Sequence, residues 1–288
     1  MSEAKPAPSS EGKQSDAAAP HFGSKDRSVT WYENTFSGVP ADCRELLENY
    51  SQIPPDEVNH HVISMRDKAW DVFPYPCIGQ FKFLRLSLYE LPSYASMVRR
   101  LKQGARYLDI GCCLGQDLRK LVHDGAPAEN LYGAELNAPF IDLSYEFFRD
   151  KGLAVNFVEA DALVLSADSP LSKLKGTIDF VHLAMVLHCF GREDQRVVLE
   201  NCVSILRPER GSLILGTAVG DLEGSQAPAG HYMHSAETFK ELWAEISERT
   251  GVEFDCRAHL DDGLGIAEAK RNFGFNKARR LVFEVKRL

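Results

Sequence analysis

Short apolar runs alternate with helix-like stretches along the C-terminal two thirds of the chain. The runs are rich in Val, Ile, Leu and aromatic residues, which predicts buried strands. They lie at residues 106–110, 130–136, 154–160, 177–185, 211–218, 253–260 and 280–287. Apolar residues at helical spacing predict helices at residues 116–125, 138–152, 192–208 and 235–251. In the last of these, Phe239, Leu242, Trp243 and Ile246 share one face, and Ser235 is a predicted N-cap.

This alternation predicts an α/β protein whose mostly parallel sheet is covered by helices on both faces. The last two predicted strands follow each other without a helix between them. We therefore expect an antiparallel hairpin at the end of the sheet, with residues 261–277 as a long connecting loop.

The N-terminal third has a different pattern. Residues 1–28 are rich in Ala, Pro, Ser, Lys and Glu and offer little to a core, which predicts a disordered tail. Residues 29–104 contain helix-like stretches at 42–50 and 91–104, the second ending at Gly104. We expect a mainly helical N-terminal cap or lid bordering a substrate region, followed by a domain spanning residues 105–288.

Composition narrows the class of protein. The 288 residues are 44% hydrophobic, and their formal net charge of −8 disfavours a nucleic-acid binder that relies on overall basic charge. No apolar run is long enough for a membrane span, and the first residues lack a secretory signal, so we expect a cytoplasmic protein. Seven cysteines without a CxxC pair favour reduced thiols over disulfides or a zinc site.

The stretch YLDIGCCLGQDL, residues 107–118, carries the first candidate chemistry. It runs from a predicted strand into a predicted helix, and ligands bind at such turns of a parallel sheet. Gly111 allows a tight turn, Gly115 opens the helix, and Asp109 places a carboxylate at the strand end. Cys113 stands where a GxGxxG dinucleotide loop has glycine. Asp109 would repel a diphosphate but suit a cationic ligand.

Two further acids follow the next two predicted strands. Glu135 lies 20 residues after Gly115, the spacing at which an acid accepts the hydroxyls of a ribose. Asp161 lies just past the third strand and is suited to accept a hydrogen bond from an adenine amino group. Each acid alone also fits a solvated strand end or loop, but three acids at three successive strand ends predict a nucleoside site.

Together these residues resemble those of class I S-adenosylmethionine (SAM) methyltransferases, over roughly residues 105–288. The resemblance implies a Rossmann-like, seven-stranded sheet, SAM as cofactor and S-adenosylhomocysteine (SAH) as product. It implies that the first turn holds the methionine end, Glu135 the ribose and Asp161 the adenine. The implied cofactor site comprises Asp109, Gly111, Gly115, Glu135 and Asp161, with Leu136 and Ala162 as neighbours. Independently of the resemblance, we expect Cys112 and Cys113 to be small apolar fillers beside the cofactor, because no further metal ligand lies nearby.

A narrower resemblance extends beyond this core. Residues 66–84 (RDKAWDVFPYPCIGQFKFL), 108–121 and 187–195 (LHCFGREDQ) are similar to fungal secondary-metabolite methyltransferases, notably the meroterpenoid carboxyl O-methyltransferases. This resemblance implies esterification of a carboxylate on a hydrophobic polyketide- or terpenoid-derived molecule. The aromatic residues of the cap fit a lid over such a substrate.

Methyl transfer from a sulfonium is an in-line displacement, for which the protein supplies position and electrostatics. A carboxylate is ionised at neutral pH and needs no general base, whereas a phenol benefits from one. His188, past the fourth strand, is the candidate to hydrogen-bond the acceptor oxygen or act as base, and a packed structural histidine fits equally well. His182, within the apolar run, is a second candidate at the substrate site.

Arginine and aromatic residues of the cap are the remaining substrate candidates. Arg66 and Arg85 are suited to hold a carboxylate in a bidentate fork, although each also fits a surface or structural role. Trp70, Tyr75 and Phe81 are suited to line an acyl pocket or to pack the cap onto the core.

Other readings remain open on the sequence. The acceptor is also compatible with a phenol, nitrogen or carbon atom, and the fold with a nicotinamide-dependent oxidoreductase or a non-catalytic binding protein. We expect a small-molecule substrate and no metal, nucleic-acid or membrane partner. A homodimer through the N-terminal region is compatible with the sequence.

Overall fold

A seven-stranded sheet forms the centre of the protein. The computed structural model describes residues 23–227, 230–264 and 277–288. The strand order is β3-β2-β1-β4-β5-β9-β8. The strands are β1 (Tyr107–Ile110), β2 (Leu131–Glu135), β3 (Asn156–Glu159), β4 (Phe180–Ala184), β5 (Leu213–Asp221), β8 (Phe254–Asp261) and β9 (Ala278–Arg287).

The strand directions match the predicted class. Strands β1 to β5 run parallel, and β9 pairs antiparallel with both β5 and β8. The predicted strands and the terminal antiparallel pair are therefore confirmed. Strand β1 lies between β2 and β4, so the strand order reverses there, and the turns after these strands meet at one edge.

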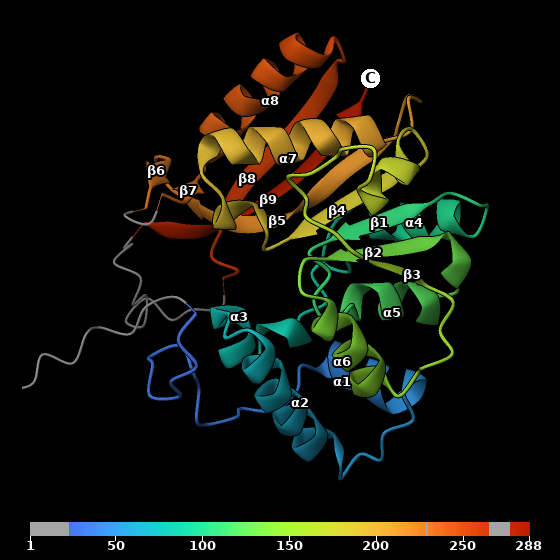
Figure 1. Ribbon diagram of the computed structural model, residues 1–288, viewed down its shortest axis with the longest axis vertical. Helices are drawn as coiled ribbons and strands as arrows, with labels where there is room; N and C mark the ends of the chain where they lie inside the picture. Colours follow the sequence, from blue (N-terminus) through green and yellow to red (C-terminus); the bar gives the residue numbers. More distant parts are fainter. Residues whose placement is uncertain (1–22, 228–229, 265–276) are drawn as a thin grey trace, which may run out of the picture.

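Helices cover both faces of the sheet (Figure 1). Helices α7 and α8 lie on one side, and α5 and α6 lie on the other. Alternation along β1 explains this arrangement, because Leu108 faces the core under α7 and α8 while Tyr107 faces α4 and α5. The helices are α4 (Tyr94–Leu101), α5 (Gln116–His123), α6 (Ala138–Phe148), α7 (Arg192–Ile205) and α8 (Ala236–Thr250).

Helix α8 begins as the sequence predicts. The Ser235 hydroxyl accepts the Thr238 N–H, and the Thr238 hydroxyl accepts the Ser235 N–H, which forms a reciprocal capping box. The helix ends at Gly251, which adopts a left-handed conformation.

The N-terminal cap packs onto α6 and shares its core. Trp70 and Met65 of the cap belong to the same buried cluster as Phe140, Phe147 and Phe148 of α6. The cap is mainly helical, as predicted. Its elements are α1 (Ala41–Glu45), the π-helical turn η1 (Leu46–Tyr50), α2 (Val58–Val72), α3 (Pro76–Gly79) and the 3₁₀ turn η2 (Lys82–Leu84).

Several short elements have no sequence prediction. Strands β6 (Ser225–Gln226) and β7 (Tyr232–Met233) form a small hairpin beside the sheet. Short 3₁₀ turns lie at η3 (Ala128–Asn130), η4 (Pro170–Leu174) and η5 (Leu187–Cys189). Most of the predicted tail and of the predicted 261–277 loop lie outside the described residues.

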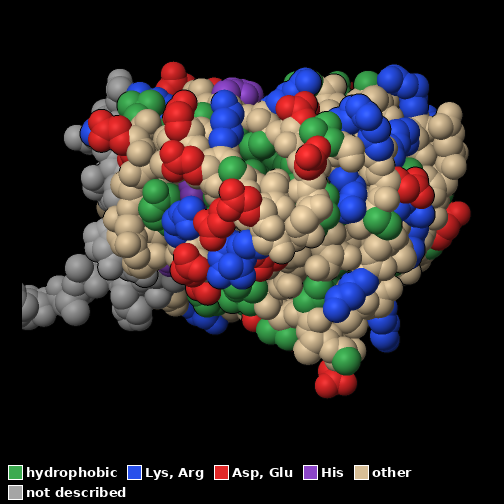
Figure 2. Space-filling view, turned by 90° about the horizontal axis from the view of Figure 1, so that it is seen from above, with side chains coloured by type: hydrophobic (Ala, Val, Ile, Leu, Met, Phe, Trp, Pro, Cys, Tyr) green, Lys and Arg blue, Asp and Glu red, His purple; other side chains and the backbone are tan. Residues whose placement is uncertain are grey.

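The outer face formed by α7 and α8 carries paired charges. Arg196 bonds to Glu193 and Glu200, and Arg249 also bonds to Glu200. Figure 2 shows basic and acidic side chains interspersed over the face that it displays. Among the described residues, no helix combines the length and apolar character that crossing a membrane requires.

Candidate cofactor and substrate site

The turn between β1 and α5 is held against the end of β2. The N–H groups of Gly111 and Cys112 donate to the Ala134 carbonyl at 2.8 and 3.1 Å. Gly111 has φ +69°, and a Cβ there would lie 2.5 Å from Cγ2 of Val186. Glycine is therefore required, because the segment after β4 passes directly over this turn.

The cysteine that replaces the expected glycine adopts a glycine-like conformation. Cys113 has φ +49°, in the left-handed region, and Gly115 follows with φ +63°. All seven cysteines are unpaired. Burial raises the pKa values of Cys112 and Cys113 well above their ordinary value, so both stay protonated thiols. This environment agrees with the expectation that the pair fills space rather than reacts.

Glu135 joins this turn to the end of β2. One carboxylate oxygen accepts the Cys113 N–H at 2.9 Å, and the other accepts the Asn137 N–H at 3.1 Å. Burial raises the pKa of Glu135, and the backbone hydrogen bonds oppose the rise. Each oxygen keeps a second lone pair, so the fixed carboxylate can still accept hydroxyl groups.

A shallow depression of about 360 Å³ lies beside Glu135, beyond the ends of β2 and β3. One oxygen of Asp161 accepts the Leu163 N–H at 2.9 Å, and the Leu136 side chain is 56% exposed. An apolar surface beside a carboxylate suits a planar base with an amino group. The lining residues are Leu136, Glu159, Ala160, Asp161, Val164, Ser166, Asp168, Ser169 and Pro170. Ala162 lies next to this lining, and its carbonyl accepts from Asn201.

Asp109 and His182 form a pair beneath the turn. Asp109 is 4% exposed, and its Oδ1 lies 2.9 Å from Nδ1 of the fully buried His182. The Tyr107 hydroxyl is also 2.9 Å from that nitrogen. His182 is thus enclosed in the sheet, and its placement does not support the predicted contact with substrate. Asp109 lies below the turn, where it is paired with His182.

His188 lies on η5, beyond the end of β4. Its Nδ1 accepts the Val219 N–H of β5 at 3.3 Å, so the neutral ring carries its proton on Nε2. Burial lowers the pKa of His188 to about 4, and the charges of His231 and Lys82 add to this effect. At neutral pH the ring is therefore an uncharged donor at Nε2 and a poor general base.

Two of the predicted substrate residues lie inside the cap core. Arg66 is 5% exposed, bonds to Asp67 and the Glu33 carbonyl, and lies over the rings of Tyr32 and Phe81. Trp70 is fully buried, and its indole N–H donates to the Lys25 carbonyl. These contacts correspond to the structural alternative for both residues, and leave neither side chain open to a substrate.

Unlike Arg66 and Trp70, the predicted substrate residues Arg85 and Tyr75 lie outside the centre of the cap core. Arg85 forms a two-pronged pair with Glu90, at 2.7 and 2.6 Å, and its fork is therefore occupied. The Tyr75 hydroxyl accepts from Nδ2 of Asn137 at 3.2 Å, directly beyond Glu135. Of the predicted cap residues, Tyr75 is the one that the structure joins to the predicted cofactor residues.

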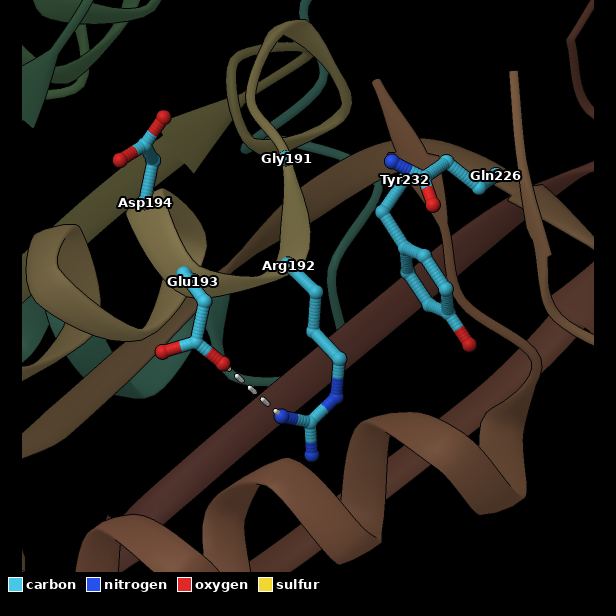
Figure 3. Close-up of a pocket in the computed structure, with 6 residues that line it drawn as sticks. All are labelled: Gly191, Arg192, Glu193, Asp194, Gln226 and Tyr232. Atoms are coloured by element: carbon cyan, nitrogen blue, oxygen red, sulfur yellow. Dashed lines mark ion pairs between the residues drawn. The ribbon is translucent and has the colours of Figure 1, made fainter. Parts of the chain in front are cut away.

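A second depression, of about 340 Å³, lies at the start of α7 (Figure 3). Figure 3 shows Arg192 pointing along it toward Glu193. That ion pair measures 3.8 Å, and a second pair joins Arg192 to Glu245 at 3.0 Å, so the guanidinium is already neutralised. The depression is lined by Gly191, Arg192, Glu193, Asp194, Gln226 and Tyr232.

Similarity to known proteins points to the same class of protein as the fold and the site. Residues 31–84 match the meroterpenoid methyltransferase N-terminal domain, and residues 108–209 match a methyltransferase domain. The chain is 42% identical over 277 residues to the O-methyltransferase atr3 of Stereocaulon alpinum, covering 93% of this chain and 79% of that one. It is 35% identical over 280 residues to the O-methyltransferase phiE of Fungal sp. (strain ATCC 74256), covering 91% and 93%.

A solved methyltransferase structure from Galdieria sulphuraria shares the fold, with a TM-score of 0.50 and 14% identity over 69% of this chain and 84% of that one. The fold and the matched domain define a SAM-dependent methyltransferase. More narrowly, the chain belongs to the family of fungal secondary-metabolite O-methyltransferases that includes atr3 and phiE. The predicted family, fold, enzyme class and SAM cofactor are therefore confirmed.

Two residues at this edge were not singled out in the sequence. Asn137 joins Glu135 to Tyr75, and its position two residues after the strand-end acid was the available signal. Asp117, in the first turn of α5, accepts the Ser87 hydroxyl and the Leu88 N–H and so ties the cap to the cofactor turn. No local pattern indicates that contact, because it spans about 30 residues of chain.

Proposed function

We propose that this SAM-dependent O-methyltransferase esterifies a carboxylate of a hydrophobic polyketide- or terpenoid-derived small molecule. The observation that carries the proposal is the hydrogen bond from the Val219 N–H to Nδ1 of His188, which fixes the neutral ring as an Nε2 donor. Burial, which lowers the pKa of His188 to about 4, also disfavours a role as base. A carboxylate acceptor is already ionised, so the reaction requires no proton acceptor. Within the described part of the chain, the Nε2–H of His188 has no acceptor, and it can therefore orient one oxygen of the substrate.

In this proposal, residues at the carboxyl ends of β1, β2 and β3 bind the cofactor. Glu135 would accept the ribose hydroxyls, because its carboxylate is fixed by two backbone N–H groups and retains lone pairs. Asp161 and Leu136 would hold the adenine in their depression. The turn from Gly111 to Gly115 would enclose the methionine end, where the absence of a Cβ permits close approach.

The bound cofactor supplies an activated methyl group on a positively charged sulfur. The protein's residues position the acceptor and exclude water. Asp109 lies beneath the turn, where its charge favours a cationic ligand. Tyr75 places an aromatic ring of the cap beside Asn137, at the boundary between the cofactor and substrate regions.

Methylation rates measured with a carboxylic acid and a phenol that carry the same decyl chain test the proposal. We expect methylation of para-decylbenzoic acid at a rate that is nearly constant from about pH 6 to 9, because no group has to lose a proton. His188→Gln, which keeps a side-chain donor, should retain most of the turnover. Preferential methylation of para-decylphenol, with a rate that rises with pH and is abolished in His188→Gln, would overturn the proposal in favour of a phenol acceptor.

A further inference from the structure

Residues 75–85 of the cap lie over the edge of the sheet at which the cofactor residues converge. The hydroxyl of Tyr75 bonds to Asn137, and the Gly79 carbonyl accepts from Arg66 at 3.4 Å. Between α3 and η2 the chain turns at Phe81, which has φ +56°. The chain before the turn is therefore fixed at two points, and Lys82 follows immediately after the turn.

Contacts among three segments show that these segments converge. Cys77 of the cap and Cys113 of the cofactor turn pack against one buried cluster. Val186, just before η5, passes over the same turn, since a Cβ at Gly111 would lie 2.5 Å from its Cγ2. The cap, the cofactor turn and the segment after β4 therefore border one space.

Lys82 adjoins this space, because η2, which begins at Lys82, packs against α3, which carries Cys77. The Lys82 ammonium acts on both Cys77 and His188. Its side chain is partly buried, and within the described ranges of the chain it has no hydrogen-bond or ion-pair partner. Burial lowers the pKa of Lys82, which shows that its charge is poorly solvated. A poorly solvated cation without an anion is costly, and binding a carboxylate would offset that cost.

The other cation of this segment is already neutralised, because Arg85 pairs with Glu90 through both prongs of its fork. Glu33 attracts Lys82 from a distance but forms no ion pair with it among the described contacts. Lys82 is therefore the basic side chain of residues 75–85 that remains available to an anionic ligand.

We propose that Lys82 is the residue that binds the substrate carboxylate and makes the enzyme selective for acids, an inference that rests on the proposed function. The ammonium holds one carboxylate oxygen, and His188 Nε2–H also donates to the carboxylate. The other oxygen forms the bond to the methyl carbon. The electron pair of the breaking carbon–sulfur bond returns to sulfur, and no proton is transferred.

Steady-state kinetics on wild type, Lys82→Met and Lys82→Arg test this assignment, with para-decylbenzoic acid and farnesoic acid as probes. Lys82→Met should raise KM for the acids on the order of 10- to 100-fold, the loss expected for one charge-assisted hydrogen bond. Its kcat and its affinity for SAH, measured by calorimetry, should stay near the wild-type values. Lys82→Arg keeps the charge and should restore KM.

Lys68→Met is the matched control, because Lys68 is also a cap lysine but pairs with Glu146 on the surface. It should leave KM unchanged. If Lys82→Met forms the ester with an unchanged KM, the assignment of Lys82 is overturned while the proposed function stands. A Lys82→Arg variant as impaired as Lys82→Met would overturn it in favour of a proton-accepting lysine. If wild type methylates neither acid, the proposed function fails, and the inference fails with it.

Discussion

At Gly111 two segments of the molecule approach more closely than any side chain would allow. A Cβ at this position would meet Val186 at 2.5 Å, in a backbone conformation that L-residues rarely adopt. Gly111→Ala should therefore displace the segment after β4 and weaken SAH binding by at least tenfold in calorimetry. Gly152→Ala is the control, since a Cβ there has no neighbour within 4 Å. Wild-type SAH affinity in Gly111→Ala would show that the turn can accommodate a Cβ without displacing Val186.

Glu135 is the residue on which the proposed cofactor contacts depend most. Glu135→Gln keeps the shape but removes the charge, and SAH affinity should fall by about 1–3 kcal/mol. Because burial raises the pKa of Glu135, wild-type affinity should also decline as pH falls toward that raised value and Glu135 becomes protonated. Glu129→Gln, on the partly exposed turn before β2, should change neither quantity. An unchanged SAH affinity in Glu135→Gln would show that the ribose does not bind at Glu135.

At the scale of elements, Asp117 connects α5 to the cap through Ser87 and Leu88. Burial raises the pKa of Asp117 from its ordinary value of 3.8 to about 6. Between these values the folded chain binds more protons than the unfolded chain, so this group's contribution to stability falls as pH rises through the window. Above it, the full cost of the buried charge is present.

Asp117→Asn removes this charge and keeps an oxygen for the Leu88 N–H. Near pH 8 we expect the variant to exceed wild type in free energy of unfolding by about 1–3 kcal/mol. The difference should largely disappear near pH 4, where wild-type Asp117 is protonated. Denaturant titrations at both pH values measure it, with the exposed Asp142→Asn as control. A variant that is less stable near pH 8 would mean that the network requires the charge.

The elements that the sequence predicted are those with a regular apolar pattern, which is nearly continuous in the central strands and periodic in the helices. Strands β1, β2, β4 and β5 are almost continuously buried because helices cover both of their faces. The β6–β7 hairpin was not predicted, since strands of two residues carry no period. The positions of Glu135 and Asp161 at or just past the ends of predicted strands were sufficient to place both acids at one edge of the sheet. The contacts of Arg66, Trp70 and Lys82 depend on long-range packing, which residue type alone does not specify.

At the scale of the whole molecule, the predicted boundary at residue 105 divides a continuous core. Phe140, Phe147 and Phe148 pack against the cap, and α4 packs against the sheet. A fragment that begins at residue 105 should therefore expose this surface, bind an apolar dye and lose a cooperative thermal transition. A fragment that begins at Gly23 lacks only part of the predicted tail and should keep the transition. Independent cooperative unfolding of the shorter fragment would show two separable domains.

Transfer of a methyl group to a carboxylate oxygen is the central claim, and the chemistry of the product tests it most directly. The purified enzyme would be incubated with trideuteromethyl-labelled SAM and para-decylbenzoic acid, and the product analysed by mass spectrometry before and after mild alkaline hydrolysis. We predict one labelled methyl group per acid, released by alkali because it is held as an ester. A label that survives alkali on a phenolic analogue, with none transferred to the acid, would contradict the account.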